Sequence, residues 1–366
     1  MKNNKFVINK RVFIMLFVIV LETFFIKLVQ FKILPAKYFY DSSRILDLTN
    51  GMASVTDKSY SFAANFFKKI NIFNFNTLNQ WSYFIAFISV VLIVEVLSKN
   101  KKISYKNLLF VIASVALLNI YVFNISKDYI QFLFFLLIFI ILKSNKILNK
   151  NKLILCSLLL LFEAYSFRIY YGIMMMLMIT IYFIYEKLIK GKKMNKKTIS
   201  KILVLALFMF FTEVFIAQLI STDNYNAISN ARYIANVSRE SSPDAVTIIN
   251  DVFGRNTTFI RFMLNYIINL VRMLLPIELM TKGFKYVPFI FYQLFITYTV
   301  FKTSTKLSDK NVMWLITVIS FIMISVIFEP DFGSFIRHES TLFLILFEMN
   351  KINEKCKEKV EKWIII

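Results

Sequence analysis

Residues 81–106 read WSYFIAFISVVLIVEVLSKNKKISYK, and this stretch decides the fold class. Its first 18 residues are almost all apolar, which is enough for an α-helix to cross the hydrocarbon core of a bilayer. Four lysines follow within eight residues, with no acidic residue between them. An apolar run that ends in a lysine cluster is typical of a transmembrane helix whose end faces the cytoplasm.

The same pattern recurs along the chain. Apolar runs predict membrane spans at about 12–29, 81–98, 107–124, 128–143, 152–167, 169–187, 201–221, 284–301, 311–328 and 336–350. The lysine runs at 99–106, 143–152, 187–201 and 351–362 all become cytoplasmic if both termini lie inside. Two long outer segments remain, at about 30–80 and 222–283. The sequence therefore predicts an all-α, polytopic membrane protein with both termini in the cytoplasm, with residues 1–366 as one integral membrane domain and a cytoplasmic tail at 351–366.

The composition supports this class and argues against others. Hydrophobic residues make up 58% of the chain, and 41 residues are phenylalanine. The net charge of +22 comes from lysines between apolar runs, so we do not expect nucleic-acid binding. With two cysteines that lie far apart and one histidine, His338, we expect neither a metal site nor another cofactor.

A further apolar stretch, at 259–280, predicts a re-entrant or interfacial helix in the second outer segment. A full crossing would place the lysines at 302–310 outside, against the charge pattern. On a helix, Thr258, Arg261, Asn265, Asn269 and Arg272 share an arc of about 80°. Two interpretations stay open: an amphipathic helix whose polar stripe lies in water, or a helix that lines a wet cavity facing a membrane-embedded substrate.

The arginines are distributed differently from the lysines. Only Arg11 of the nine arginines falls on the predicted cytoplasmic side, and the other eight lie in outer segments or at outer ends of spans: Arg44, Arg168, Arg232, Arg239, Arg255, Arg261, Arg272 and Arg337. Guanidinium is a planar, five-donor group suited to phosphate and carboxylate. This asymmetry predicts an extracytoplasmic site for a polyanionic ligand.

The densest group of reactive side chains lies in EPDFGSFIRHE, residues 329–339. Pro330 and Gly333 suit a turn between two helices. Arg337 is a candidate to bind a phosphate or a sugar carboxylate, and Asp331, His338 or Glu339 to transfer a proton. The alternative is a polar turn whose charges pair with one another.

Two further stretches carry candidate binding residues. In SFRIYY, residues 166–171, Arg168 is held between two spans, and Tyr170 and Tyr171 suit stacking on a sugar or anchoring at the interface. The alternative for Arg168 is a guanidinium that extends to lipid headgroups. In PAKYFYDSSR, residues 35–44, Arg44 is a candidate ligand-binding residue, or forms a local ion pair with Asp41 one helical turn away.

The layout resembles that of bacterial oligosaccharide repeat-unit polymerases of the Wzy type. The stretches around 35–44, 166–171 and 329–339 are similar to segments of Gram-positive capsule and exopolysaccharide members. The resemblance implies a metal-independent glycosyltransferase that joins polyprenyl-diphosphate-linked repeat units on the outer face of the membrane. It also implies outer-face arginines at the site, for which Arg168, Arg261, Arg272 and Arg337 are available, and a flippase and a chain-length regulator as partners.

Two other functions stay open. A flippase for lipid-linked oligosaccharides needs cationic residues in a cavity reachable from both sides, whereas the predicted spans carry few charges at mid-depth, with Glu95, Glu163, Glu213 and Glu348 as the main acidic exceptions. A membrane acyltransferase acting on surface glycans usually depends on a histidine. His338 lies on the predicted outer side, where it is poorly placed to use a cytoplasmic acyl donor. The few glycines and prolines also argue against the broken helices of transporters.

Overall fold

The computed structural model describes residues 10–190, 196–237, 246–305 and 308–364. Within these ranges every regular element is a helix, and the only extended pairing is a single β-bridge between Ile248 and Asp331. The predicted all-α class is therefore confirmed. The chain forms two compact units: unit 1 comprises Met1–Leu137, Ser166–Arg168 and Ser340–Phe347, and unit 2 comprises Ile138–Tyr165, Ile169–Glu339 and Glu348–Ile366.

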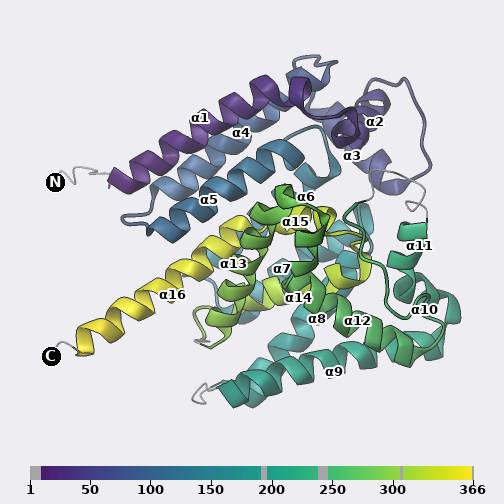
Figure 1. The fold of residues 1–366 in the computed structure, drawn as a ribbon, viewed down its shortest axis with the longest axis vertical. Helices are drawn as coiled ribbons and strands as arrows, with labels where there is room; N and C mark the ends of the chain where they lie inside the picture. Colours follow the sequence, from purple (N-terminus) through teal and green to yellow (C-terminus); the bar gives the residue numbers. More distant parts are fainter. Residues whose placement is uncertain (1–9, 191–195, 238–245, 306–307, 365–366) are drawn as a thin grey trace. The chain divides into compact units, whose positions relative to one another are not determined.

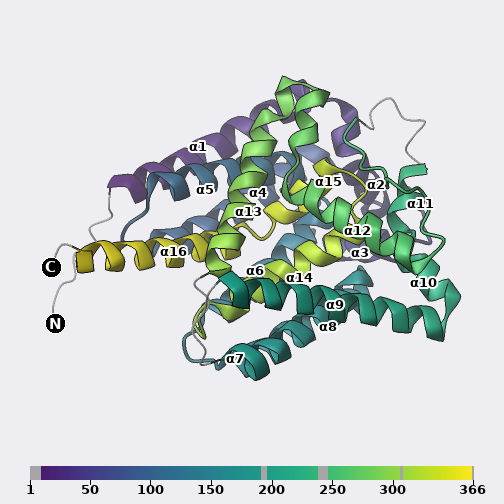
Figure 2. The same cartoon turned by 60° about the horizontal axis from the view of Figure 1, so that its bottom comes forward.

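Three long helices pack side by side in unit 1 (Figures 1 and 2). They are α1 (Lys10–Ile33), α4 (Leu78–Ser98) and α5 (Tyr105–Leu117), which continues into the π-helical turn η2 (Leu118–Val122). The guanidinium carbon of Arg11 lies 4.2 Å from the centre of the Tyr105 ring, so the first turns of α1 and α5 are neighbours. The lysine-rich link between α4 and α5 therefore lies at the same end of these helices as Arg11.

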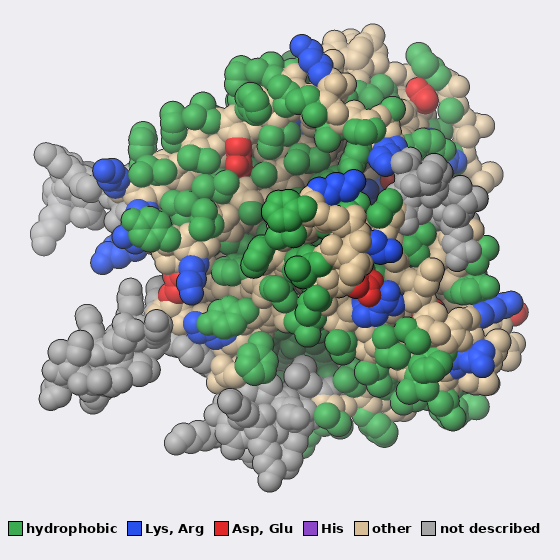
Figure 3. Space-filling view, viewed as in Figure 1, with side chains coloured by type: hydrophobic (Ala, Val, Ile, Leu, Met, Phe, Trp, Pro, Cys, Tyr) green, Lys and Arg blue, Asp and Glu red, His purple; other side chains and the backbone are tan. Residues whose placement is uncertain are grey.

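The helix α1 has a buried stripe and an exposed apolar face. Val12, Met15 and Ile19 follow the three-to-four-residue spacing of one helix face and are fully buried. Phe17, Phe24 and other large apolar side chains of α1 remain more than half exposed. Hydrophobic side chains cover much of the visible surface over α1 and α4 (Figure 3). A helix that is apolar on both its packed and its exposed face suits contact with lipid.

Lys27 of α1 is almost fully buried and caps the end of the α5–η2 helix. Its Nζ donates to the carbonyl oxygens of Asn119 at 2.6 Å and Phe123 at 2.7 Å, and to the Gln30 and Asn124 side chains at 3.2 and 3.3 Å. The last carbonyls of a helix have no intrahelical donor, and a cation is favoured there by the helix dipole. Lys27 thus fixes the end of this helix against α1.

Short helices occupy the other end of unit 1. They are η1 (Ala36–Phe39), α2 (Tyr40–Thr49) and α3 (Lys58–Ile70), together with the first part of α6 (Lys127–Lys143). The carboxylate of Asp57 caps α3 by accepting from the backbone N–H groups of Ser59 at 2.8 Å and Tyr60 at 3.2 Å. This cap fixes the start of α3 and therefore places Tyr60 in its first turn.

In unit 2, the apolar helix α14 (Val312–Phe328) lies at the centre, because nearly all of its side chains are buried. Packed against it are α8 (Tyr170–Ile184), which continues into the π-helical turn η3 (Tyr185–Ile189), and α13 (Val287–Ser304). The helix α9 (Lys196–Ile220) packs on α8, and α7 (Asn149–Ser166) precedes α8 in the chain.

The second outer segment folds onto α14. It contains α10 (Thr222–Ser229), α11 (Ala231–Val237) and α12 (Phe259–Leu274), followed by the 3-10 turns η4 (Ile277–Lys282) and η5 (Phe284–Tyr286). The 16 residues of α12 cover about 24 Å, which is shorter than the hydrocarbon core of about 30 Å. Whether α12 re-enters the membrane or lies at its surface stays a prediction.

Four helices are long and apolar enough to cross a membrane among the residues that the structure describes: Lys10–Ile33, Leu78–Ser98, Tyr105–Val122 and Tyr170–Leu188. They correspond to the predicted spans at 12–29, 81–98, 107–124 and 169–187. Val204–Ile216 and Val312–Phe328 form shorter apolar helices at two further predicted spans. The count of ten spans stays a prediction.

The predicted span at 336–350 does not form one helix. The chain instead forms α15 (Phe332–Ser340) and α16 (Phe343–Ile364), with a turn at Thr341. Hydroxyl side chains such as those of Ser340 and Thr341 compete with the helical backbone for hydrogen bonds. The Thr341 hydroxyl accepts from the Gln131 side chain at 3.3 Å. The break separates the charged residues of α15 from the apolar start of α16.

Candidate functional site

In unit 2, the segment before α12 pairs with the turn between α14 and α15. The backbone N–H of Ile249 donates to the carbonyl of Pro330 at 3.0 Å, and the N–H of Phe332 donates to Thr247 at 3.1 Å. The turn at 329–331 and the polar stripe of α12 are therefore connected through one stretch of chain, residues 247–257. Two segments that the sequence singled out separately thus belong to one polar region.

The middle of the α12 stripe is covered by this stretch of chain. The Asn265 side chain accepts from the N–H of Phe253 at 3.0 Å and donates to the carbonyl of Gly254 at 3.0 Å and to Asn256 at 2.7 Å. Asn269 donates to Asp251 at 2.5 Å. Because this irregular stretch lacks the regular backbone hydrogen bonds of a helix or sheet, the asparagine side chains provide partners that hold it in place. This arrangement differs from both sequence-based interpretations, since the middle of the stripe faces neither water nor an open cavity.

The arginines at the two ends of the stripe also bind this stretch. Arg272 donates from Nε and Nη2 to the two oxygens of Glu278 at 2.7 and 2.8 Å, and from Nη1 to the carbonyl of Asn250 at 2.7 Å. The exposed Arg261 donates to the Thr257 hydroxyl at 3.2 Å. Most donors of Arg272 are therefore occupied by its own chain.

Arg232 of α11 lies at the base of this region and is 3% exposed. Its Nη2 donates to the carbonyl of Val326, whereas its Nη1 is buried and has no hydrogen-bond partner among the described residues. Burial lowers the pKa of Arg232 to about 10, and the charges of Asp251 and Glu329 oppose this shift. Burial also raises the pKa of Asp251, and the nearby charge of Arg232 opposes this rise. No local sequence pattern distinguishes Arg232 from the other outer arginines.

In the turn and α15, two of the three candidate catalytic residues, His338 and Asp331, have structural partners. His338 Nδ1 lies 2.6 Å from Glu329 Oε1, and both side chains are buried. Asp331 caps α15 by accepting from the N–H of Ser334 at 2.8 Å. A side chain at Gly333 would lie 3.1 Å from the Asp331 carboxylate, so glycine suits this position. Glu339 is fully buried, and neither of its carboxylate oxygens has a hydrogen-bond partner among the described residues.

The remaining candidates of unit 2 lie near α14 and on α15. Tyr171 is fully buried, and the Tyr170 ring stacks on Phe328 with a centroid distance of 5.0 Å. These tyrosines anchor the start of α8 against the end of α14. Arg337 is half-buried on α15. Arg239 lies outside the described residues.

Unit 1 contains the second polar region, centred on the Tyr60 ring. The guanidinium carbon of Arg44 lies 4.5 Å from the ring centre, and the Nζ of Lys127 lies 3.7 Å from it. The Tyr60 hydroxyl donates to Asp41. Asp41 therefore binds Tyr60 and does not form the local ion pair with Arg44 that the sequence also allowed. We call Asp41, Arg44, Tyr60 and Lys127 the Tyr60 cluster.

Arg168 lies beside the Tyr60 cluster and is anchored to α6. Its Nη1 donates to Gln131 at 2.7 Å, and its Nη2 to Asp128 at 3.1 Å. The ion pair is largely buried, so the guanidinium is held by protein groups in preference to lipid headgroups. Arg168 and Lys127 are close enough for their charges to interact. Unit 1 thus brings together Arg44 and Arg168, which the sequence predicted, with Lys127 and Tyr60, which it did not.

No protein-family model, curated protein or solved structure matches this chain. Within the described ranges, no group of three or more His, Cys, Asp or Glu side chains is placed to hold a metal ion. The functional proposal therefore depends on the geometry of the two polar regions.

Proposed function

We propose that this protein polymerises polyprenyl-diphosphate-linked oligosaccharide repeat units on the outer face of a bacterial cytoplasmic membrane, and that the Tyr60 cluster binds the diphosphate of the carrier. One observation supports this assignment above the others. Arg44 and Lys127 both lie over the Tyr60 ring, and neither has a hydrogen-bond acceptor in the part of the chain that the structure describes. Their N–H donors are therefore held in place and available to an anion.

The carboxylates of this region are already engaged. Asp57 caps α3, Asp41 accepts from Tyr60, and Asp128 pairs with Arg168. The formal charges of the three carboxylates and the three cations balance, so attraction by net charge does not explain the site. What distinguishes it is the pair of cations with open donors, of which Arg44 is exposed to incoming ligand.

The chemistry follows from the leaving group. As the bond between the anomeric carbon and the diphosphate oxygen breaks, negative charge develops on the diphosphate, and cationic donors already in place stabilise it. The acceptor sugar hydroxyl loses a proton as the new glycosidic bond forms. We assign that proton to the carboxylate of Asp41, which belongs to the same cluster and accepts from the Tyr60 hydroxyl through one of its two oxygens.

The test is genetic deletion in the native host, followed by complementation. Polymerisation predicts that deletion leaves single lipid-linked repeats exposed outside the cell and abolishes long glycan. Complementation with Arg44→Ala/Lys127→Ala should reproduce the deletion at normal protein level, whereas the matched variant Arg255→Ala/Arg261→Ala should restore polymer. Repeats protected from an external glycosidase in intact cells would instead show a flippase. Unchanged glycan with missing acyl groups would show an acyltransferase.

A further inference from the structure

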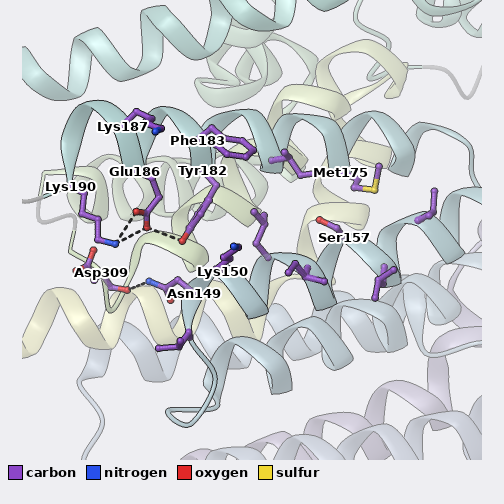
Figure 4. Close-up of a pocket in the computed structure, with 16 residues that line it drawn as sticks. Asn149, Lys150, Ser157, Met175, Tyr182, Phe183, Glu186, Lys187, Lys190 and Asp309 are labelled. Atoms are coloured by element: carbon purple, nitrogen blue, oxygen red, sulfur yellow. Dashed lines mark hydrogen bonds and ion pairs between the residues drawn. The ribbon is translucent and has the colours of Figure 1, made fainter.

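Unit 2 contains a pocket that the sequence did not indicate and that neither polar region includes. It has a volume of about 820 Å³ and lies between α7 and the α8–η3 helix (Figure 4). Apolar side chains line most of it, including Leu153, Leu161, Met175 and Ile179, while one end is polar. From Asn149 to Leu161 the wall of α7 extends about 18 Å, which exceeds the half-thickness of a bilayer core, about 15 Å.

At the polar end, both carboxylates are already engaged. Glu186 accepts from the Tyr182 hydroxyl at 2.8 Å and from Lys190 at 2.8 and 3.0 Å. Asp309 accepts from the Tyr185 hydroxyl, and its backbone carbonyl accepts from Asn149 at 2.6 Å. Figure 4 shows Tyr182, Glu186 and Lys190 on one wall of the pocket, joined by these bonds.

Two lysines of the pocket have no such partner. Lys150 and Lys187 line it, are exposed, and make no hydrogen bond or ion pair within the described ranges. They come from the runs 143–152 and 187–201, which the charge pattern places at the cytoplasmic headgroup level. Deeper in the apolar part, the buried hydroxyl of Ser157 also has no hydrogen-bond partner among the described residues. Figure 4 shows this hydroxyl on the side that faces the polar end.

We propose that this pocket binds an anionic glycerophospholipid of the cytoplasmic leaflet, with its phosphate at Lys150 and Lys187 and one acyl chain along α7 and α8. The apolar lining and length fit an acyl chain, and the two ammonium groups, which have no partner among the described residues, fit a phosphate. A lysine near an anionic lipid surface contributes about a fivefold gain in affinity, so two lysines should give roughly 25-fold. The site is independent of the proposed polymerase activity.

The test uses the purified full chain in detergent and counts bound lipid by native mass spectrometry. The probes are phosphatidylglycerol and phosphatidylcholine with identical acyl chains. We expect phosphatidylglycerol to be preferred, and Lys150→Gln/Lys187→Gln to lose that preference by roughly 25-fold. The control Lys101→Gln/Lys102→Gln removes the same charge from exposed lysines of unit 1 and should keep it. Equal binding of both lipids, or an equal loss in the control, would overturn the proposal.

A second variant tests the apolar part without changing charge. Ile179→Trp places a large side chain at the pocket wall and should reduce retention of both lipids about tenfold, at an unchanged melting temperature. Full retention in this variant would mean that the lipid binds elsewhere. Excess inorganic phosphate should not displace phosphatidylglycerol; displacement at millimolar phosphate would show a simple anion site and reject the lipid.

Discussion

Arg272 in unit 2 and Arg44 in unit 1 are both outer arginines by sequence, but their surroundings differ. Arg272 uses three donor atoms on Glu278 and the carbonyl of Asn250. The guanidinium carbon of Arg44 lies 4.5 Å from the centre of the Tyr60 ring, and its N–H donors make no hydrogen bond among the described residues. An arginine that holds its own chain stabilises the fold, whereas one held on an aromatic ring keeps its donors for a ligand. We therefore assign a structural role to Arg232 and Arg272 of unit 2 and ligand binding to the Tyr60 cluster of unit 1.

The largest effect on stability is expected at Arg232. Arg232→Ala leaves the neighbouring charges of Asp251 and Glu329 without their buried cation and should destabilise the fold by about 3–5 kcal/mol. Thermal unfolding of the purified protein in detergent measures this. The control Arg261→Ala, on an exposed side chain, should stay within about 0.5 kcal/mol of wild type. Similar melting temperatures for the two variants would contradict a structural role for Arg232.

Asn265 gives the next largest expected effect. Asn265→Ala removes the side-chain hydrogen bonds to the N–H of Phe253 and the carbonyl of Gly254, and each part-buried bond of this kind contributes about 0.5–1.5 kcal/mol. We expect faster hydrogen exchange at residues 250–257 before global unfolding. Leu264→Ala, at an exposed position of the same helix, is the control. Unaltered exchange in this segment would mean that the asparagines of α12 do not hold it.

The contrast between α12 and α15 shows what the sequence could predict. Helical spacing alone identified the polar stripe of α12. Five polar side chains share one face of the helix, and their positions around the axis do not depend on what they contact. It could not show that residues 250–257 cover that face, since the partners are backbone groups of a loop without a pattern. Hydropathy predicted the long apolar helices in the same way, because the apolar character of a stretch depends only on its own residues. It missed the break at Thr341, which depends on competition between side-chain and backbone hydrogen bonds.

The candidate site was predictable only in part. Arginine distribution pointed to Arg44 and Arg168, because guanidinium on the outer side departs from the usual charge pattern. Tyr60 and Lys127 were missed because they are distant in sequence and meet only through the packing of α3 on the start of α6. Lys127 also precedes a predicted span, where a lysine usually anchors the helix at the membrane interface, so its position alone did not indicate ligand binding.

Arg168→Lys tests whether Arg168 positions the start of α6 within unit 1. A lysine cannot donate to Gln131 and Asp128 in the geometry of the guanidinium fork, so the start of α6 that carries Lys127 should shift. We expect polymer to fall about tenfold, equivalent to about 1.4 kcal/mol, at normal protein level. Polymer is quantified on gels against membrane-inserted protein. Wild-type polymer length would mean that Arg168 contributes to helix packing but does not position Lys127.

The smallest effect is expected at the Tyr60 hydroxyl. Tyr60→Phe removes the hydrogen bond to Asp41 and keeps the ring, so stability should fall by about 0.5–1.5 kcal/mol and polymer by no more than about twofold. Tyr60→Leu removes the ring itself and should lower polymer much further. Equal polymer in the two variants would show that the ring does not position Arg44 and Lys127.

The most direct test is to measure diphosphate binding, because ligand binding is assigned to unit 1 and structural roles to the arginines of unit 2. Titration of the purified protein with a short-chain prenyl diphosphate should give a Kd at least about tenfold weaker for Arg44→Ala/Lys127→Ala, at an unchanged melting temperature. The matched variant Arg255→Ala/Arg261→Ala, which removes the same charge from exposed arginines of unit 2, should bind as wild type does. Wild-type affinity in the unit 1 variant, or an equal loss in the unit 2 variant, would contradict the account.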